Sequence, residues 1–258
     1  MGKRAQVGIV IPTLGTREDY LSECLDSLSS EEVFVAVVGP SGLSNKLDLA
    51  SADIVLDDKG ISLPLAINMA IRNLPAHCTY VSWIGDDDSL SINSIRAQID
   101  VFENHPSVVA TFGQCQYVDS TGARLLVQRS GQFASSALTW GPNLIPQPGG
   151  LFRRSAWESL GGLDENFSQA FDTDMYLRLR QIGELRYIPQ VLANYRWHED
   201  ALSVGNRWRS IEESSQARKK NARSAVTTLV PVDWLVRWTT LLAGKILSLR
   251  LKMKRGRQ

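Results

Sequence analysis

The chain has 258 residues, 43% of them apolar and 21% charged, which suits one large domain or two small ones with a hydrophobic core. Its 28 Lys and Arg residues nearly balance 27 Asp and Glu residues, which excludes a strongly basic surface that would gather nucleic acid. The cysteines Cys24, Cys78 and Cys115 form no CxxC pair, so neither a disulfide framework nor a thiolate zinc site is expected. The first apolar run is short and ends at Pro12, so no signal peptide is expected and a cytoplasmic protein is favoured.

Strands and helices are predicted to alternate over the first hundred residues. Apolar runs without alternation, typical of central parallel strands, occupy residues 7–11, 33–38, 54–56 and 80–84. Apolar residues at helical spacing follow them, and the first such set is Leu21, Cys24, Leu25 and Leu28. This order predicts an α/β fold with a mostly parallel sheet and helices on both faces, in which ligands bind beyond the carboxyl ends of the strands.

The pattern changes after residue 108. Short strands are predicted at residues 108–112 and 123–127, on either side of a turn at 119–122. A stretch rich in Gly and Pro then continues to Gly150, and a helix is predicted again at residues 172–182.

Three consecutive aspartates, Asp86, Asp87 and Asp88, follow the fourth predicted strand and one glycine. Adjacent carboxylates repel one another unless a cation or hydrogen-bond donors offset their charge, and Mg²⁺ and Mn²⁺ accept such oxygen ligands while also binding diphosphate. Alternatively, Asp88 or Ser89 caps the following helix and its neighbours are solvated. The triplet alone does not decide between these two interpretations.

The aspartate triplet is part of one of seven motifs that occur in order along the chain: IVIPT, DKGIS, WIGDDDSL, QPGGLFRRS, GGLDENF, FDTDMYLRL and YRWHEDALS. With them the chain resembles the family 2 glycosyltransferases of the GT-A fold, from Val7 to about Val204. The resemblance implies an inverting enzyme that moves a sugar from a nucleotide-diphosphate sugar to a saccharide or lipid-linked acceptor in bacterial polysaccharide or glycolipid assembly. It also implies a GT-A domain over residues 1–205, with a nucleotide-binding half to about residue 112 and an acceptor half from residue 113.

The same resemblance assigns site residues. Those expected to contact the nucleotide sugar are Pro12, Thr13, Asp58, Gly60, Asn68, Asp86, Asp87, Arg153 and Asp174. Those expected to hold Mn²⁺ or Mg²⁺ are Asp86, Asp87, Asp88 and His198. For Arg153 a surface position beside the next helix is the alternative, and for His198 a purely structural role.

Asp172 and Asp174 open a predicted helix, where unpaired N–H groups stabilise carboxylates, so a capping role alone accounts for them. The resemblance assigns the catalytic base to Asp172 and a supporting position to Asp174. A carboxylate suits the task because an acceptor hydroxyl is a poor nucleophile until its proton is removed.

The chain departs from the family pattern at three places. Commoner versions of the acidic motif have an acid where Gly85 stands, so the register within the triplet stays open. After the second strand many relatives carry an acidic pair, whereas this chain reads Val38-Gly39-Pro40-Ser41-Gly42, and Leu63-Pro64 replaces an acid and a small residue. These changes leave the donor's identity open and keep a non-catalytic nucleotide-sugar or carbohydrate-binding protein as the alternative function.

Residues 206–258 are predicted to form a helical, basic tail. In a helix over residues 229–258, Leu235, Trp238, Leu242 and Ile246 share one face, and five basic residues follow near the end of the chain. Such a helix can lie on an anionic membrane surface, which would suit a lipid-linked acceptor. The alternative is that it packs on the domain or pairs in a dimer.

Overall fold

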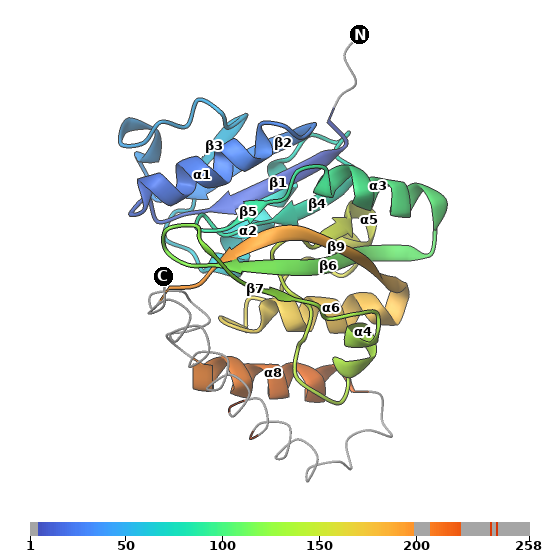
Figure 1. Cartoon of the computed structure of the whole chain (residues 1–258). Helices are drawn as coiled ribbons and strands as arrows, with labels where there is room; N and C mark the ends of the chain where they lie inside the picture. The colour runs from blue at the N-terminus through green and yellow to red at the C-terminus, as the bar shows by residue number, and fades with distance from the viewer. Residues whose placement is uncertain (1–4, 199–206, 223–237, 239–240, 242–258) are drawn as a thin grey trace.

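The computed structural model describes residues 5–198 and 207–222, together with Trp238 and Leu241 (Figure 1). The strands of these residues are β1 (Val7–Pro12), β2 (Val33–Gly39), β3 (Ile54–Asp57), β4 (Tyr80–Trp83), β5 (Ser89–Leu90), β6 (Val108–Val118), β7 (Arg124–Gln128), β8 (Leu151–Arg153) and β9 (Glu184–Arg196). The helices are α1 (Glu18–Leu28), the 3₁₀ turn η1 (Leu43–Asn45), α2 (Leu63–Asn73), α3 (Ser94–Asn104), α4 (Phe133–Ala137), α5 (Arg154–Ser159), α6 (Phe171–Ile182) and α8 (Arg207–Asn221).

The strands form one sheet in the order β3-β2-β1-β4-β8-β6-β9-β5, with β7 paired to β6. Strands β1 to β4 are parallel to one another, as the apolar runs predict. Strand β8 is antiparallel to both β4 and β6, whereas β9 is parallel to β6. The α/β class is therefore confirmed, and the sheet is parallel in its first half and mixed in its second.

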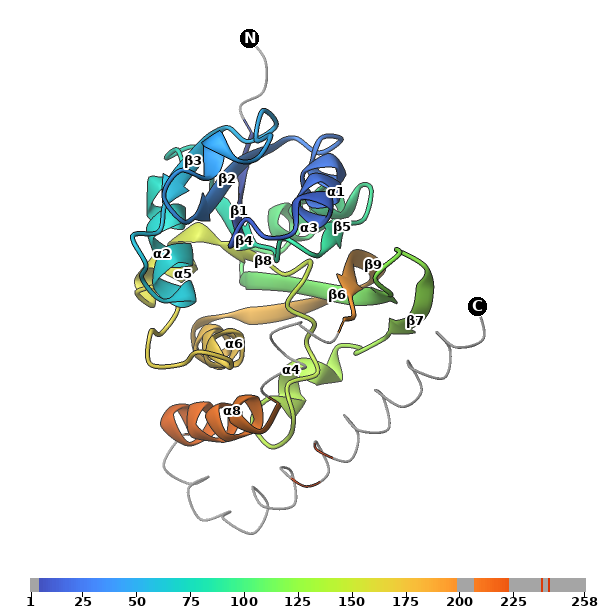
Figure 2. The same ribbon diagram turned by 90° about the vertical axis from the view of Figure 1, so that its left-hand side faces the viewer.

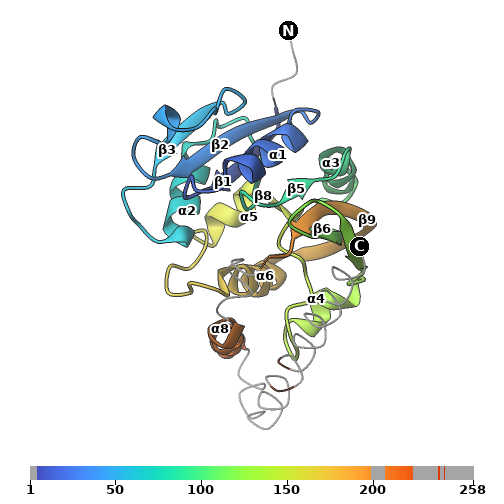
Figure 3. The ribbon, with the colours of Figure 1, turned by 60° about the vertical axis from the view of Figure 1, so that its left-hand side comes forward.

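Helices cover both faces of the sheet because alternate residues of a strand point to opposite sides. Val10 of β1 packs in a core with residues of α2, α5 and α6, whereas Ile9 and Ile11 pack with residues of α1 and α3. Figures 2 and 3 show α1 and α2 on opposite sides of β1 and β2. The predicted apolar face of α1, with Leu21 and Leu25, is buried in this way.

The long pair β6 and β9 departs from the predicted strands. Strand β6 continues to Val118, beyond the predicted end at residue 112, and lies beside the 13-residue β9 (Figure 1). Their pairing jumps from Gly113 opposite Ile188 to Gln114 opposite Val191, which leaves Pro189 outside the ladder. Because proline has no N–H to donate, it fits at such an irregularity, and its presence hides the strand from pattern reading.

Helix α8 lies beside α6, as Figures 1 and 2 both show. Its Ala217 is fully buried in the core that α2, α5 and α6 share. The domain boundary at residue 205 stays a prediction, and α8 packs against the residues before it. The predicted amphipathic helix at 229–258 lies outside the described residues, Trp238 and Leu241 excepted. Within the described part of the chain, no helix has the length and apolar character needed to cross a membrane.

Candidate active site

A cavity of about 790 Å³ opens at the carboxyl ends of the parallel strands, where the fold class predicts a ligand site. Residues far apart in the sequence line it: Pro12 at the end of β1, Thr13 after it, Val38 of β2, Asp58 after β3, Asp86 to Asp88 after β4, Asp172 of α6 and Ile211 of α8. The two acidic clusters of the sequence therefore meet at one cavity, although Asp172 follows Asp88 by 84 positions.

The acidic triplet lies in a tight turn, in which the Asp88 N–H donates to the Gly85 carbonyl at 3.1 Å. A β-carbon at position 85 would lie 2.7 Å from Asp87 Oδ1 and 3.4 Å from Asp88 Oδ2. These two carboxylate oxygens thus converge on the space beside Gly85, and a side chain there would fill it. The departure from the family motif at this position has a geometric consequence: glycine leaves room between two carboxylates.

Thr13 fixes the first aspartate of the triplet. Its hydroxyl donates to Asp86 Oδ2 at 2.5 Å and accepts the N–H of Gly15 at 3.0 Å. Burial raises the pKa of Asp86 above its ordinary value, although the hydrogen bond from Thr13 opposes that shift. The predicted nucleotide-pocket residue Thr13 and the predicted metal residue Asp86 are therefore direct partners.

Arg17 and His198 converge on the second aspartate. Arg17 Nη1 lies 3.0 Å from Asp87 Oδ2 and 4.0 Å from Asp86 Oδ1, and His198 Nε2 lies 2.8 Å from Asp87 Oδ2. His198 thus contacts Asp87 of the acidic turn, and its role as a metal ligand stays a prediction. Arg17 is absent from the sequence-based assignment. Its place in the loop after β1, at the same sheet edge as the triplet, is the signal that marks it.

Arg196, at the end of β9, holds the third aspartate. Its backbone N–H donates to Asp88 Oδ1 at 2.9 Å, and its Nε donates to the Asp87 carbonyl at 3.1 Å. The guanidinium also pairs with Glu23 and lies 4.4 Å from the ring centre of Tyr20. Burial raises the pKa of Asp88 well above its ordinary value, and the neighbouring Asp87 carboxylate raises it further. Arg196 belongs to the YRWHED motif, but the sequence gives it no partner.

The described residues contain no cluster of three or more His, Cys, Asp or Glu side chains arranged to hold a metal ion. The turn fits a more open arrangement, because Asp87 Oδ1 and Asp88 Oδ2 converge beside Gly85. Mg²⁺ and Mn²⁺ accept one or two carboxylates and complete their coordination with water and substrate phosphates. The donor set therefore suits such an ion bound together with a diphosphate.

Asp172 lies in the first turn of α6, half-buried at the cavity wall. The Thr173 N–H donates to its Oδ1 at 2.6 Å, and Asn143 Nδ2 donates to its Oδ2 at 3.2 Å. Burial raises the pKa of Asp172 to about 6, although the hydrogen bonds from Thr173 oppose the shift. A carboxylate with this pKa is both ionised near neutral pH and a better proton acceptor than an exposed one.

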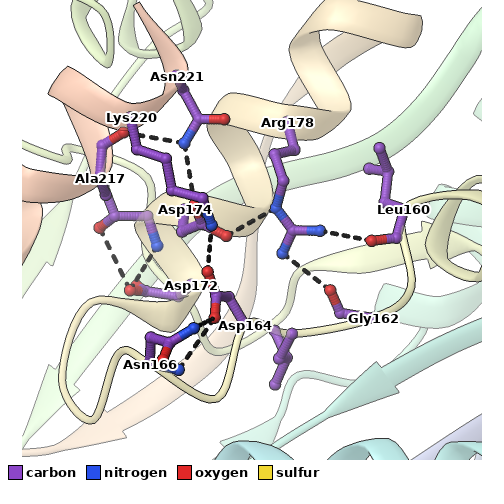
Figure 4. A network of polar contacts seen from close by, with 12 residues as sticks. Leu160, Gly162, Asp164, Asn166, Asp172, Asp174, Arg178, Ala217, Lys220 and Asn221 are labelled. Carbon is purple, nitrogen blue, oxygen red and sulfur yellow. Dashed lines mark hydrogen bonds and ion pairs between the residues drawn. The ribbon is translucent and has the colours of Figure 1, made fainter.

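Asp174 is not part of the cavity lining, and Figure 4 shows it in a polar network with Arg178 and Asn221. Arg178 Nε donates to its Oδ2 at 2.7 Å and Asn221 Nδ2 to its Oδ1 at 2.9 Å, while its side chain is 0% exposed. Side chains two positions apart on a helix differ in direction by about 200°, so Asp172 and Asp174 lie on nearly opposite sides of α6. Nucleotide-sugar contact by Asp174 stays a prediction, and its observed contacts join α6 to α8.

Three further residues of the expected nucleotide site lie outside the cavity lining. Gly60 is close to it, since its N–H donates to Asp58 Oδ1 at 2.8 Å. Asn68 exchanges two hydrogen bonds of 2.8 Å with the backbone of Leu163. Arg153 donates to the Val108 carbonyl at 3.1 Å, and its guanidinium lies 5.1 Å from the ring centre of Phe102. Asn68 and Arg153 thus join structural elements, and their predicted ligand contacts are untested.

The sheet order and the helices that flank it are those of the GT-A fold, which two solved structures share. A mannosyltransferase from Pyrobaculum calidifontis, solved with GDP-Man and Mn²⁺, has a TM-score of 0.61 and 14% identity, over 95% of this chain and 81% of that one. S. aureus TarS 1-349 in complex with UDP-GlcNAc has a TM-score of 0.58 and 12% identity, over 82% of this chain and 66% of that one. These likenesses confirm the predicted GT-A fold.

Sequence comparison finds distant relatives among polysaccharide synthases. The chain is 23% identical to the chondroitin synthase of Escherichia coli over 157 residues, which are 58% of this chain and 21% of that protein. The chain thus spans about a fifth of the length of the curated relatives that it matches. No protein-family model matches the chain. The relatives are consistent with the resemblance to the family 2 glycosyltransferases.

Proposed function

We propose that this protein is an inverting glycosyltransferase that moves a sugar from a nucleoside-diphosphate sugar to an acceptor hydroxyl in polysaccharide or glycolipid assembly. The observation that carries this proposal is the meeting of two acidic sites at one cavity. One is the turn Asp86 to Asp88, in which carboxylate oxygens of Asp87 and Asp88 converge, and the other is Asp172, whose pKa is raised to about 6. Two such environments suit the two tasks of the reaction, binding the diphosphate and removing a proton.

The donor side of the cavity is made by the loops after β1, β3 and β4, with Pro12, Thr13 and Asp58 in its lining. Asp87 and Asp88 would hold a divalent cation, while Thr13 keeps Asp86 in place beside them. A bound Mn²⁺ or Mg²⁺ would offset the negative charge that develops on the diphosphate as it leaves. The mannosyltransferase solved with GDP-Man and Mn²⁺ supports both a nucleotide-sugar donor and a divalent cation.

Asp172 would act as the catalytic base. It takes the proton from the acceptor hydroxyl while that oxygen forms a bond to the anomeric carbon of the donor sugar. The bond from this carbon to the diphosphate oxygen breaks, and the nucleoside diphosphate leaves with the electron pair. A single displacement of this kind inverts the anomeric centre. Asn143 and Thr173 orient the carboxylate, because each donates a hydrogen bond to one of its oxygens.

The acceptor is a saccharide or a lipid-linked saccharide, which the similarity to a chondroitin synthase supports. A cytoplasmic location, with residues 229–258 on the inner face of the membrane, suits such an acceptor. Vesicle flotation tests the membrane contact: removal of residues 229–258 should release the protein from anionic vesicles without weakening nucleotide binding.

A donor panel tests the activity. UDP- and GDP-linked sugars are incubated with the protein and Mn²⁺, with and without saccharide acceptors, and released nucleoside diphosphate is measured. At least one donor should support transfer or slow hydrolysis, and the Asp172→Asn variant should support neither. If the wild-type protein binds nucleotide but neither transfers nor hydrolyses any donor, it is a nucleotide-sugar-binding protein on a glycosyltransferase fold.

A further inference from the structure

Glu213 of α8 binds the backbone of the segment just before α6. Its side chain is 7% exposed, and its Oε2 accepts the N–H groups of Ser168, Gln169 and Ala170 at 2.8, 2.7 and 3.1 Å. Its other oxygen accepts the Ser168 hydroxyl at 2.8 Å and Arg209 Nε at 2.9 Å. One carboxylate therefore fixes three successive peptide groups.

The negative charge of the Glu213 carboxylate strengthens these hydrogen bonds. Burial alone raises the pKa of Glu213, but the hydrogen bonds from Gln169, Ser168 and Ala170 outweigh burial and hold the pKa below its ordinary value. Glu213 is therefore ionised at neutral pH, and its hydrogen bonds to N–H groups are of the stronger, charge-assisted kind.

The segment that Glu213 holds leads directly into the candidate base. Ala170 is the residue before the first turn of α6, and Asp172 lies two positions further on. Gln169 and Asp172 both line the cavity. A shift of residues 168–170 would therefore move the Asp172 carboxylate relative to the bound substrates.

Helix α8 also forms part of the cavity wall. Ser210, Ile211, Ser214 and Arg218 line the cavity, and α8 packs against α6, the helix that carries Asp172. The C-terminal end of α8 is joined to α6, because Asn221 Nδ2 donates to Asp174 Oδ1 at 2.9 Å (Figure 4). The residues that follow the predicted domain boundary thus belong to the site itself.

We propose that Glu213 is a positioning residue for glycosyl transfer: it holds residues 168–170 so that Asp172 faces the acceptor. This inference rests on the proposed function of the same cavity. Glu213 hydrogen-bonds only to residues 168–170 and Arg209 among the contacts observed, whereas the proposed nucleotide side consists of the loops after β1, β3 and β4. Loss of Glu213 should therefore lower kcat and leave nucleotide affinity unchanged. A purely structural role would instead lower kcat and nucleotide affinity together.

Three variants separate these roles. Glu213→Ala removes all five hydrogen bonds, and Glu213→Gln keeps an oxygen for the three backbone N–H groups. Glu212→Ala is the matched control, because Glu212 is the exposed neighbour on the same helix. Transfer kinetics and nucleotide calorimetry are measured on the full chain of each variant, with the donor that the wild type uses.

Glu213→Ala should lower kcat by roughly 10- to 100-fold, because small displacements of catalytic groups have effects of this size, while its nucleotide Kd stays within about threefold of the wild type. Glu213→Gln should keep kcat within about threefold, because the positioning hydrogen bonds remain. Glu212→Ala should match the wild type. The proposal is overturned if Glu213→Ala keeps the wild-type kcat, or if it loses nucleotide affinity together with transfer, as an unfolded variant would. A wild type without transfer or hydrolysis would instead overturn the proposed function.

Discussion

The turn after β4 and the first turn of α6 both present carboxylates to one cavity, but the groups that contact these carboxylates differ. Asp87 lies 3.0 Å from Arg17 and 2.8 Å from His198, and Asp88 accepts a backbone hydrogen bond from Arg196. Asp172 has neutral donors, the amide of Asn143 and the backbone of Thr173. The turn concentrates charge that other charges must balance, whereas α6 provides one carboxylate in surroundings that favour proton uptake. In the proposed mechanism the same chemical group serves two purposes because its neighbours differ.

A second contrast lies within α6 itself. Asp172 faces the cavity, while Asp174 is buried against Arg178 and Asn221. The pair Asp174–Arg178 is further tied to the chain by Arg178, which donates to the carbonyls of Leu160 and Gly162 at 2.9 and 2.8 Å. We therefore expect Asp172 to determine activity and Asp174 to determine stability.

The largest expected effect is that of Asp172→Asn on transfer. An amide of the same size cannot accept the proton of the acceptor hydroxyl, so kcat should fall by about 10²- to 10⁴-fold. Steady-state kinetics with the donor identified by the panel measure this loss. Retention of more than about a tenth of the wild-type kcat would exclude Asp172 as the base, since general-base catalysis contributes more than that.

Asp174→Asn should instead weaken the fold. Removal of one charge from a buried, hydrogen-bonded pair leaves Arg178 without its counter-charge, which should lower the free energy of unfolding by about 2–4 kcal/mol. Urea denaturation followed by circular dichroism measures the change. Glu158→Gln is the control, because Glu158 pairs with Arg154 with 54% of its own side chain exposed and should change stability by less than about 1 kcal/mol. Equal effects of both substitutions would contradict the assigned role of Asp174.

The pH dependence of kcat sharpens the contrast further. The base works in its ionised form, and burial raises the pKa of Asp172 to about 6. At saturating donor and cation, kcat should therefore be constant above pH 7 and fall about tenfold between pH 7 and pH 5. Nucleotide binding measured at the same pH values serves as the control, since burial also raises the pKa of Asp86 and Asp88. A kcat that does not change down to pH 4.5 would rule out a base with this pKa.

Pattern reading located the parallel half of the sheet because each strand there is a local apolar run, and sheet direction then fixes which edge carries the site. Asp86 to Asp88 and Asp172, which the ordered motifs mark as site residues, line one cavity at that edge. Pattern reading gives no strand at β9, because Pro189 interrupts the apolar run. In the structure Pro189 lies where the pairing with β6 shifts register, so the strand continues past it.

The remaining site residues have no local signature. Arg17 and Arg196 contact Asp87 across 70 and 109 positions of sequence, so only the tertiary fold brings them together. Glu213 reaches the backbone before α6 across more than 40 positions, from a segment that composition marks only as a basic tail. The direction of Asp174 relative to Asp172 can be predicted from sequence, because side chains two positions apart on a helix point about 200° apart.

The proposed roles of the two acidic regions, cation binding by the turn after β4 and proton removal by Asp172, are tested most directly by Mn²⁺-dependent nucleotide binding in three proteins. Isothermal titration calorimetry compares the wild type with Asp172→Asn and Asp88→Asn. We expect Asp172→Asn to bind nucleoside diphosphate within about threefold of the wild type, and Asp88→Asn to bind it at least about tenfold more weakly because a carboxylate ligand of the cation is lost. The reverse pattern, with weaker binding in Asp172→Asn and unchanged binding in Asp88→Asn, would contradict the assignment of both sites.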